Sequence, residues 1–310
     1  MISRYPVFIP KLLSRDEYFV SGRRSCRGCG KALAVRMICK MVGKDIILSG
    51  YSKDSSLLSS YAQAGIGLTW DELSSGELTT SFVDRLVAEN ERATKGEGRG
   101  KGIKKAVIGI DRRIFSKDPL AFTGILKNHR EVVYICYDSE MYMDELIRRF
   151  LPRALNTHGE SQPLEKDEIR QFIQNKNISP LIGESCINYV ATACPSYPLD
   201  LMEKVIKGIQ ISGTAFISVL TPCPTAWLFK PDLTIHLGFL AVATGFYPLF
   251  EIEAGNLKVT KRISPLHPLM EYFKAQQRYI AFPPELISLI QEVVVEEYEK
   301  LIADGKERSR

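Results

Sequence analysis

Two cysteines near the start of the chain have the spacing of a metal-binding or redox-active pair. Cys26 and Cys29 lie in the run SCRGCG, where Gly28 and Gly30 let backbone N–H groups approach the sulfur atoms. Such a C-x-x-C pair occurs in zinc sites, iron–sulfur sites and redox dithiols, and two unligated thiols at a helix start are a further option. Cys223, held between prolines in TPCPTAW, is a candidate third ligand that spacing alone does not assign.

The other cysteines and the histidines show no catalytic pattern. The four histidines stand apart with no H-x-x-x-H or H-E-x-x-H spacing, and no G-x-S-x-G nucleophile motif occurs. The remaining four cysteines lie in apolar runs, where we expect buried packing thiols: Cys39, Cys136, Cys186 and Cys194. The residues by themselves therefore name no catalytic group.

The elements that must position these residues alternate between strands and helices. Five short apolar runs, each bounded by turn or polar residues, predict strands buried on both faces: Asp45–Leu48, Ala106–Ile110, Val132–Tyr137, Tyr189–Thr192 and Thr214–Leu220. Helical patterns cover Lys31–Met41 and Pro198–Ile211, the second with proline at its start. This alternation predicts an α/β fold, a mostly parallel sheet with helices on both faces.

The end of the chain has a different pattern. Apolar residues at helical spacing predict an amphipathic helix over Pro284–Ile302. We therefore divide the chain into an α/β domain, residues 1–260, and a helical tail, residues 261–310. The apolar face of the tail is expected to pack on this domain or on a partner subunit.

Composition limits the location and the partners. A chain of 310 residues with 45% hydrophobic content can bury one large core or two moderate ones. A net charge of +5 is too small to predict a nucleic-acid partner. No apolar run is long enough for a signal peptide or a membrane span, so we expect a cytoplasmic protein without a membrane partner.

Several motifs, in matching order and spacing, resemble one family. Cys26–Gly30 is followed by KALAVR, and four further segments fit: Tyr134–Met143 (YICYDSEMYM), Tyr189–Pro198 (YVATACPSYP), Leu220–Trp227 (LTPCPTAW) and Thr244–Glu253 (TGFYPLFEIE). Together they resemble the thiamine-diphosphate-binding β subunits of 2-oxoacid:ferredoxin oxidoreductases, pyruvate oxidoreductases among them. The resemblance extends from about Asp16 to about Tyr279 and implies the thiamine-diphosphate-binding fold.

The resemblance implies an iron–sulfur cluster with an altered ligand set. In the family four cysteines hold a [4Fe–4S] cluster, and Cys26, Cys29 and Cys223 match three of them. The fourth position falls in the turn Ser49–Gly50–Tyr51, where Tyr51 replaces the thiolate. A phenol, with an ordinary pKa of about 10, is a harder and poorer ligand for cluster iron. Three thiolates could hold a cluster with an odd fourth ligand, a three-iron cluster, zinc or nothing.

The resemblance also implies a thiamine diphosphate and Mg²⁺ site. Asp111, directly after AVIGI, matches the family's metal-binding aspartate, and the segment beginning at Tyr137–Asp138 follows 27 residues later, in the family register. Ser139 matches the position of the second metal ligand. Asp138, Ser139 and Glu140 are therefore expected beside the cofactor, together with Asp111.

Bulky and charged residues replace the small ones that this site uses. Ile110, Arg112 and Arg113 stand where the family has glycines, and Asp144–Glu145–Leu146 replaces Asn-Thr-Gly. Long side chains crowd a backbone built to approach phosphate, and two carboxylates repel it. The arginines could bind phosphate instead. We favour the alternative in which Arg112, Arg113, Asp144 and Glu145 form salt bridges across an emptied site.

Two functional hypotheses follow from the resemblance. In the first, the chain is a β subunit that works with an α subunit, a ferredoxin-like subunit and ferredoxin. The implied reaction is oxidative decarboxylation of a 2-oxoacid to acyl-CoA, with electrons passing to ferredoxin. In the second, it is a non-catalytic β-like paralogue, a structural or regulatory subunit of such a complex without its own thiamine diphosphate.

Overall fold

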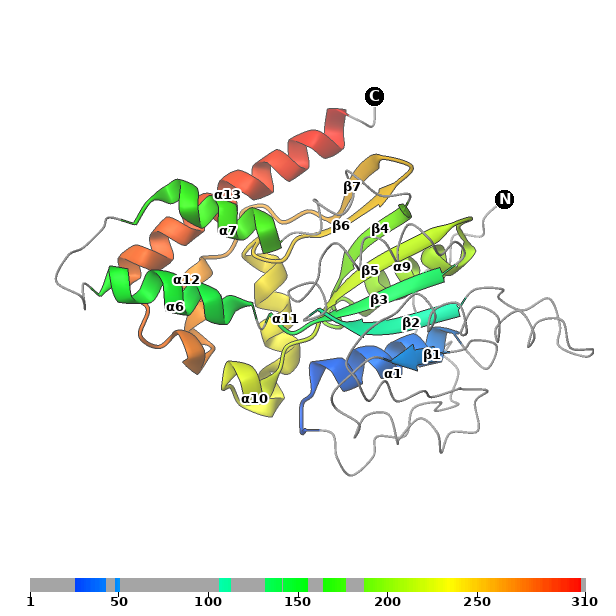
Figure 1. Ribbon diagram of the computed structural model, residues 1–310, viewed down its shortest axis with the longest axis horizontal. Coiled ribbons are helices and arrows are strands. Elements are labelled where there is room, and N and C mark those ends of the chain that lie inside the picture. Colours follow the sequence, from blue (N-terminus) through cyan, green and yellow to red (C-terminus); the bar gives the residue numbers. More distant parts are fainter. Residues whose placement is uncertain are drawn as a thin grey trace, which may run out of the picture.

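Seven strands form one sheet within the part of the chain that the computed structural model describes, residues 26–42, 48–50, 106–112, 132–140, 142–155, 164–176 and 187–307. The strand order is β1-β2-β3-β5-β4-β6-β7 (Figure 1). The bounds are β1 Leu48–Gly50, β2 Ala106–Asp111, β3 Val132–Asp138, β4 Ile187–Ala193, β5 Thr214–Leu220, β6 Leu249–Glu253 and β7 Asn256–Lys261. Strands β1 to β5 pair in parallel, while β6 and β7 add an antiparallel hairpin beside β4.

Burial explains why the central strands could be predicted from apolar runs. Every residue of β3 and of β5 is buried, as expected for parallel strands covered on both faces. In β7, by contrast, only the alternate residues Leu257 and Val259 are buried. The prediction of a mostly parallel sheet is confirmed, and the antiparallel hairpin is an addition to it.

Helices cover both faces of the sheet. The helices are α1 Gly30–Val42, α6 Met143–Ala154, α7 Lys166–Lys176, α9 Pro198–Gln210, α10 Pro224–Trp227, α11 Thr234–Ala243, α12 Leu269–Lys274 and α13 Pro284–Glu307, with 3₁₀ turns at Pro231–Leu233 and Gln277–Tyr279. Helices α1 and α9 pack on one face. Neighbouring residues of β6 point to opposite faces: Glu251 pairs with Lys207 of α9, whereas Phe250 lines a cavity with Tyr298 of α13.

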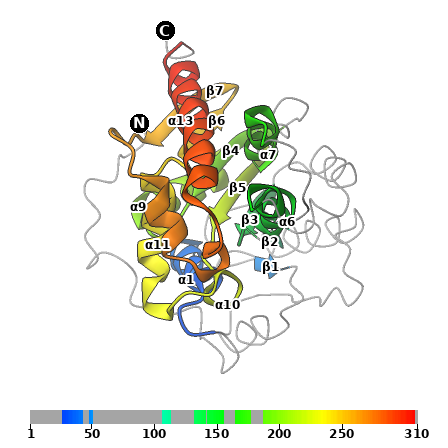
Figure 2. The same cartoon turned by 90° about the vertical axis from the view of Figure 1, so that its left-hand side faces the viewer.

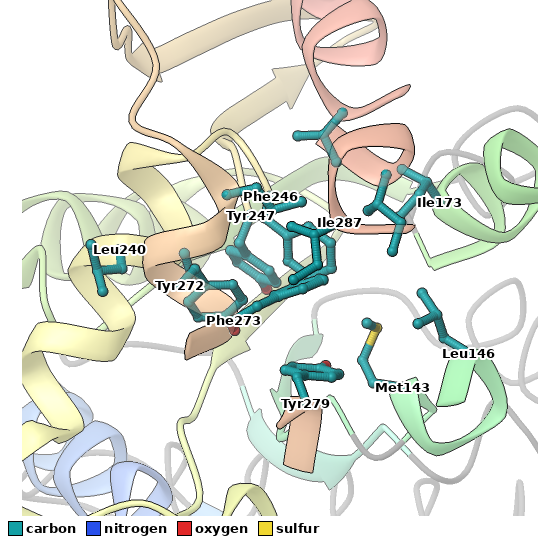
Figure 3. Close-up of a cluster of buried hydrophobic side chains, with 14 of the residues drawn as sticks. Met143, Leu146, Ile173, Leu240, Phe246, Tyr247, Tyr272, Phe273, Tyr279 and Ile287 are labelled. Carbon is teal, nitrogen blue, oxygen red and sulfur yellow. The ribbon is translucent and has the colours of Figure 1, made fainter. Parts of the chain in front are cut away.

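A second core lies among α6, α7, α11, α12 and α13. It meets the sheet at the carboxyl ends of β4 and β5, through Cys194 and Leu220. Tyr272, Phe273 and Tyr279, from the end of the chain, lie in the same core as Met143 of α6 (Figure 3). Residues beyond position 260 therefore complete the same core as residues of the α/β domain, and α13 lies along α7 and β7 (Figure 2).

Most predicted elements are found at or near their expected bounds. Lys31–Met41 lies within α1, Pro198–Ile211 is α9 apart from its last residue, and the helix predicted over Pro284–Ile302 continues to Glu307 as α13. Of Asp45–Leu48, only Leu48 is described. Ser49 and Gly50, expected in a turn, are strand residues of β1, so that expectation was wrong. In the described part of the chain, no helix combines the length and the apolar character needed to cross a bilayer.

Candidate functional site

The cysteine turn packs tightly against the segment after β5. The Cys29 N–H donates to the Cys26 carbonyl at 3.2 Å, and the Gly30 N–H donates to the Pro222 carbonyl at 3.1 Å. A Cβ atom on Gly28, whose φ is +69°, would lie 2.3 Å from the Pro231 carbonyl oxygen. One on Gly30 would lie 2.6 Å from the Pro222 carbonyl oxygen. The glycines therefore allow two backbone segments, far apart in the sequence, to touch.

This packing gathers the three candidate thiols at one edge of the sheet. Cys223 precedes α10, and the Thr225 hydroxyl of α10 donates to the Cys26 sulfur at 3.6 Å. Burial raises the pKa of the Cys29 thiol, backbone N–H groups oppose that rise, and nearby Cys223 and Cys26 add to it. The turn that carries Cys26 and Cys29 therefore lies beside the segment that carries Cys223.

The geometry does not make these thiols a metal site. Nowhere among the described residues do three His, Cys, Asp or Glu side chains lie in positions that could hold a metal ion. Tyr51, at the implied fourth position, lies outside the described residues. As the described residues are arranged, they do not fit a cluster, although the donor type is right for one.

The second half of the site is the turn after β3, residues 138–140. Strands β2, β3 and β5 are parallel, so their carboxyl ends meet at one edge of the sheet. The Thr221 N–H donates to the Asp138 carbonyl at 2.7 Å, and the indole Nε1–H of Trp227 donates to the Ser139 carbonyl at 2.7 Å. The Glu140 N–H donates to Asp138 Oδ1 at 2.8 Å. Thr221, which follows β5, and Trp227 of α10 thus fix the backbone of this turn.

Arg112 reaches into this turn from the end of β2. Its Nη1 lies 3.3 Å from Oδ2 of Asp138, whose side chain is 1% exposed. Its Nη2 donates to the Lys176 carbonyl at 2.6 Å, and its guanidinium lies 4.7 Å from the Tyr142 ring centroid. Burial is the largest single effect and disfavours the charged guanidinium, but the Asp138 carboxylate and other nearby groups together outweigh burial and raise the pKa of Arg112. Burial likewise raises the pKa of Asp138, against the opposing effect of Arg112.

A second arginine holds Glu140. Glu140 is fully buried and has a φ of +51°. The Arg278 Nη2 lies 2.8 Å from Glu140 Oε2, and the Tyr272 hydroxyl donates to the same oxygen at 2.9 Å. The Arg278 guanidinium lies 4.3 Å from the Trp227 ring centroid and 4.6 Å from that of Tyr279. Both carboxylates of the turn are therefore neutralised by side chains of this chain.

Lys176, at the end of α7, is a third buried cation near the turn. Its Nζ donates to the Phe246 carbonyl at 2.6 Å and lies 3.1 Å from the Phe246 ring centroid. Burial lowers the pKa of Lys176 from 10.5 to about 7, although Glu140 and Asp138 act in the opposite direction. No ion pair joins it to a carboxylate among the residues that the structure describes. This amine therefore titrates near neutral pH.

The structure locates some of the predicted site residues and not others. Asp111 ends β2, opposite Tyr137 in the register, but its side chain and all of Arg113 lie outside the described residues. Asp144 and Glu145 are exposed in the first turn of α6, and neither forms an ion pair with a described residue. The salt bridges predicted between these two carboxylates and Arg113 lie outside the described residues. Arg112 does form an ion pair, but with Asp138, which was not among the predicted partners.

Sequence reasoning missed the residues that complete this turn. Arg278 and Lys176 come from the tail and from α7, and no spacing in the sequence links either to Asp138. Trp227 is buried in the second core and also donates a hydrogen bond to the turn. The signal that could have marked Trp227 was its place in LTPCPTAW, the segment that also carries Cys223.

The described residues do not fit a magnesium–diphosphate group at this turn. Mg²⁺ takes carboxylate and other oxygen ligands, and the carboxylates of Asp138 and Glu140 are already paired with arginines. A diphosphate needs bare backbone or free donors, and the Arg112 guanidinium instead forms an ion pair with Asp138 and donates to the Lys176 carbonyl. As arranged, this turn therefore supports no reaction of thiamine diphosphate.

Comparison with known proteins places the chain among its relatives. It is 33% identical to pyruvate synthase subunit PorB of Methanocaldococcus jannaschii, across 91% of this chain and 95% of the relative. It is 30% identical to ketoisovalerate oxidoreductase subunit VorB of Pyrococcus furiosus, across 92% and 93%. No family model matches the chain.

A solved structure is also similar, but only loosely. It is 2-oxoglutarate:ferredoxin oxidoreductase from Magnetococcus marinus with 2-oxoglutarate, coenzyme A and succinyl-CoA bound. The TM-score is 0.36 at 14% identity, over 67% of this chain and 71% of that one, which is too low to carry an argument. The two curated relatives match nearly end to end, and they decide the assignment: the chain belongs to the family of β subunits of 2-oxoacid:ferredoxin oxidoreductases.

Proposed function

We propose that this chain acts as the β subunit of a complex that decarboxylates a 2-oxoacid oxidatively to acyl-CoA and passes the electrons to ferredoxin. The observation that carries the proposal is the identity to pyruvate synthase subunit PorB over almost the full length of both chains. The partners of the chain are then an α subunit, a ferredoxin-like subunit and ferredoxin. The cytoplasm stays its predicted location.

The residues that would serve this function lie at the carboxyl edge of the sheet. Cys26, Cys29 and Cys223 are the candidate ligands of an iron–sulfur cluster, which would carry electrons when bound. The packing of Gly28 and Gly30 against the segment after β5 supports this assignment, because it places the turn of Cys26 and Cys29 beside the segment that carries Cys223. Asp111 and Ser139 match the positions of the family's Mg²⁺ ligands, but the carboxylates of Asp138 and Glu140 beside them are paired with arginines and argue against magnesium there.

One observation favours a second candidate function. The ion pair between Arg112 and Asp138 fills the turn that the resemblance assigns to thiamine diphosphate. It favours a non-catalytic β-like subunit, which keeps the fold and the contacts with other subunits while another chain supplies the cofactor. The two candidates share the same complex and differ in what this chain binds.

Purification of the complex through a tag on this chain tests the proposal. We expect other subunits to co-purify, and we expect the complex to reduce ferredoxin when a 2-oxoacid and coenzyme A are both supplied. Pyruvate, ketoisovalerate and 2-oxoglutarate should be compared as substrates. A tagged chain that purifies alone, from a host that still performs the reaction without it, would remove the proposal.

The cluster ligands need a separate measurement. Iron and acid-labile sulfide per chain should fall in Cys223→Ser, and Cys39→Ser, which alters a buried core thiol, is the matched control. Equal iron content in the two variants would show that Cys223 is not a ligand.

A further inference from the structure

We infer that Arg112 closes the turn after β3 to the magnesium–diphosphate group, so that this chain takes its place in the complex without a thiamine diphosphate of its own. The identity of the excluded ligand rests on the proposed function. The closure itself rests on the contacts of Arg112, Asp138 and Glu140.

Arg112 lies at the edge of the sheet where ligands usually bind in folds of this kind. It follows β2 directly, and its N–H donates to the Tyr137 carbonyl of β3 at 3.1 Å. It therefore stands at the edge where the parallel strands β2, β3 and β5 end. In open α/β sheets ligands bind outside this edge, so a side chain anchored here competes with a ligand for the same space.

The charges of the turn already balance without a ligand. Asp138 and Glu140 carry the two negative charges of the turn, and Arg112 and Arg278 each lie within 3.3 Å of one of them. The set is neutral as folded. A magnesium ion that took either of these carboxylates as a ligand would have to displace a guanidinium and leave a buried arginine without its partner, which typically costs several kcal/mol.

The directions of the Arg112 N–H groups decide whether this side chain could hold a phosphate. A phosphate-binding arginine presents two parallel N–H groups to the anion. Here Nη1 faces Asp138, Nη2 donates to the Lys176 carbonyl, and the central carbon of the guanidinium lies 4.7 Å from the Tyr142 ring centroid. Its side chain is only 17% exposed. The geometry is that of an internal counter-ion and contradicts the alternative in which Arg112 binds phosphate.

Hydrogen bonds hold the backbone of the turn in place. Thr221 and Trp227 hold the carbonyls of Asp138 and Ser139, and Asp138 itself accepts the Glu140 N–H. Three independent hydrogen bonds thus fix the turn before any ligand arrives. A conformational change that released Arg112 would either break these hydrogen bonds or leave the buried Asp138 carboxylate without its counter-ion.

The test compares cofactor content in complexes that differ only in this chain. Complexes containing the wild-type chain, Arg112→Ala or Arg148→Ala are saturated with thiamine diphosphate and Mg²⁺ and then desalted. Arg148 is an exposed arginine of α6 and serves as the matched control. Bound thiamine diphosphate per copy of this chain is measured, and affinity is measured by calorimetric titration.

We expect no thiamine diphosphate attributable to the wild-type chain or to Arg148→Ala. We expect at least tenfold tighter binding in Arg112→Ala. One equivalent per wild-type chain would overturn the inference. So would an Arg112→Ala complex that is folded by circular dichroism and still binds no better than wild type, because Arg112 would then not be the barrier.

Two safeguards keep the result readable. If Arg112→Ala does not fold, Arg112→Met, which keeps the length and removes the charge, replaces it. Thermal shift of the wild-type complex with thiamine diphosphate and Mg²⁺ needs no variant, and a stabilising shift would also overturn the inference unless another subunit carries the cofactor. Failure of the proposed function would appear separately, as a chain without co-purifying subunits.

Discussion

The guanidinium of Arg278 lies 2.8 Å from the carboxylate of Glu140, a residue 138 positions earlier in the chain. Their side chains are 5% and 0% exposed. This pair ties the tail to the turn after β3, so the tail is part of the candidate site and not an appendage to it. Any change at one end of the pair should be felt at the other.

Glu140→Gln should destabilise the chain strongly. The substitution keeps the shape and removes the charge, so the buried Arg278 guanidinium loses its counter-ion, which costs about 3–5 kcal/mol of the free energy of unfolding. Glu145→Gln, on the exposed side of α6, is the control and should change it by less than about 0.5 kcal/mol. Urea unfolding measures both. Equal effects would mean that the pair has no structural role.

Gly28→Ala should disturb the cysteine turn more than a comparable glycine substitution elsewhere. Gly28 and Gly255 both have positive φ, +69° and +80°, but a Cβ on Gly255 meets nothing within 4 Å. Gly255→Ala therefore shows the cost of backbone strain alone, about 1 kcal/mol. Gly28→Ala adds the contact with the Pro231 carbonyl. Unfolding free energies that match would show that the close approach does not exist in solution.

Lys176 should make stability depend on pH above neutrality. Its pKa is lowered to about 7 in the folded chain, because burial disfavours the ammonium, and returns toward 10.5 on unfolding. Between these values the unfolded chain binds more protons, so the free energy of unfolding rises with pH by up to about 1.4 kcal/mol per pH unit.

The comparison with Lys176→Met isolates this contribution from the other groups that titrate in the same range. The wild-type chain should gain stability relative to the variant as pH rises from 7 to 10. Denaturant unfolding at a series of pH values gives the difference. A difference that stays constant over this range would contradict the lowered pKa.

Trp227→Phe should weaken the turn through a single lost hydrogen bond. The indole N–H is the donor to the Ser139 carbonyl, and its loss leaves that carbonyl unsatisfied at a cost of about 1–3 kcal/mol, in addition to packing. Tyr279→Phe is the control, because no described residue hydrogen-bonds the buried Tyr279 hydroxyl. We expect that variant to be as stable as wild type or more so. The reverse order of stability would refute the assigned contact.

The sheet could be predicted from the sequence because its central strands are buried on both faces. Such strands read as continuous apolar runs, as in Val132–Tyr137 and Thr214–Leu220. Strand β7 reads NLKVTK and alternates, since one of its faces is exposed, and it was not recognised. Strand β2 ends at Asp111, one residue beyond the predicted run. The prediction followed apolar residues, and Asp111 is polar.

The candidate site could be predicted only in part, for a different reason. Local runs marked Asp138, Glu140 and the cysteine turn, because each belongs to a short motif. The counter-ion of Glu140 comes from the tail, and the carbonyl that accepts from Arg112 belongs to α7. Pairings between distant segments depend on tertiary packing, which leaves no spacing in the sequence.

An experimental structure of the assembled complex, prepared with excess thiamine diphosphate and Mg²⁺, tests the central claim most directly. The account predicts Arg112 in contact with Asp138, Arg278 in contact with Glu140, and no diphosphate against residues 138–140 of this chain. A diphosphate and a magnesium ion bound at that turn, with the Arg112 side chain displaced from Asp138, would contradict it.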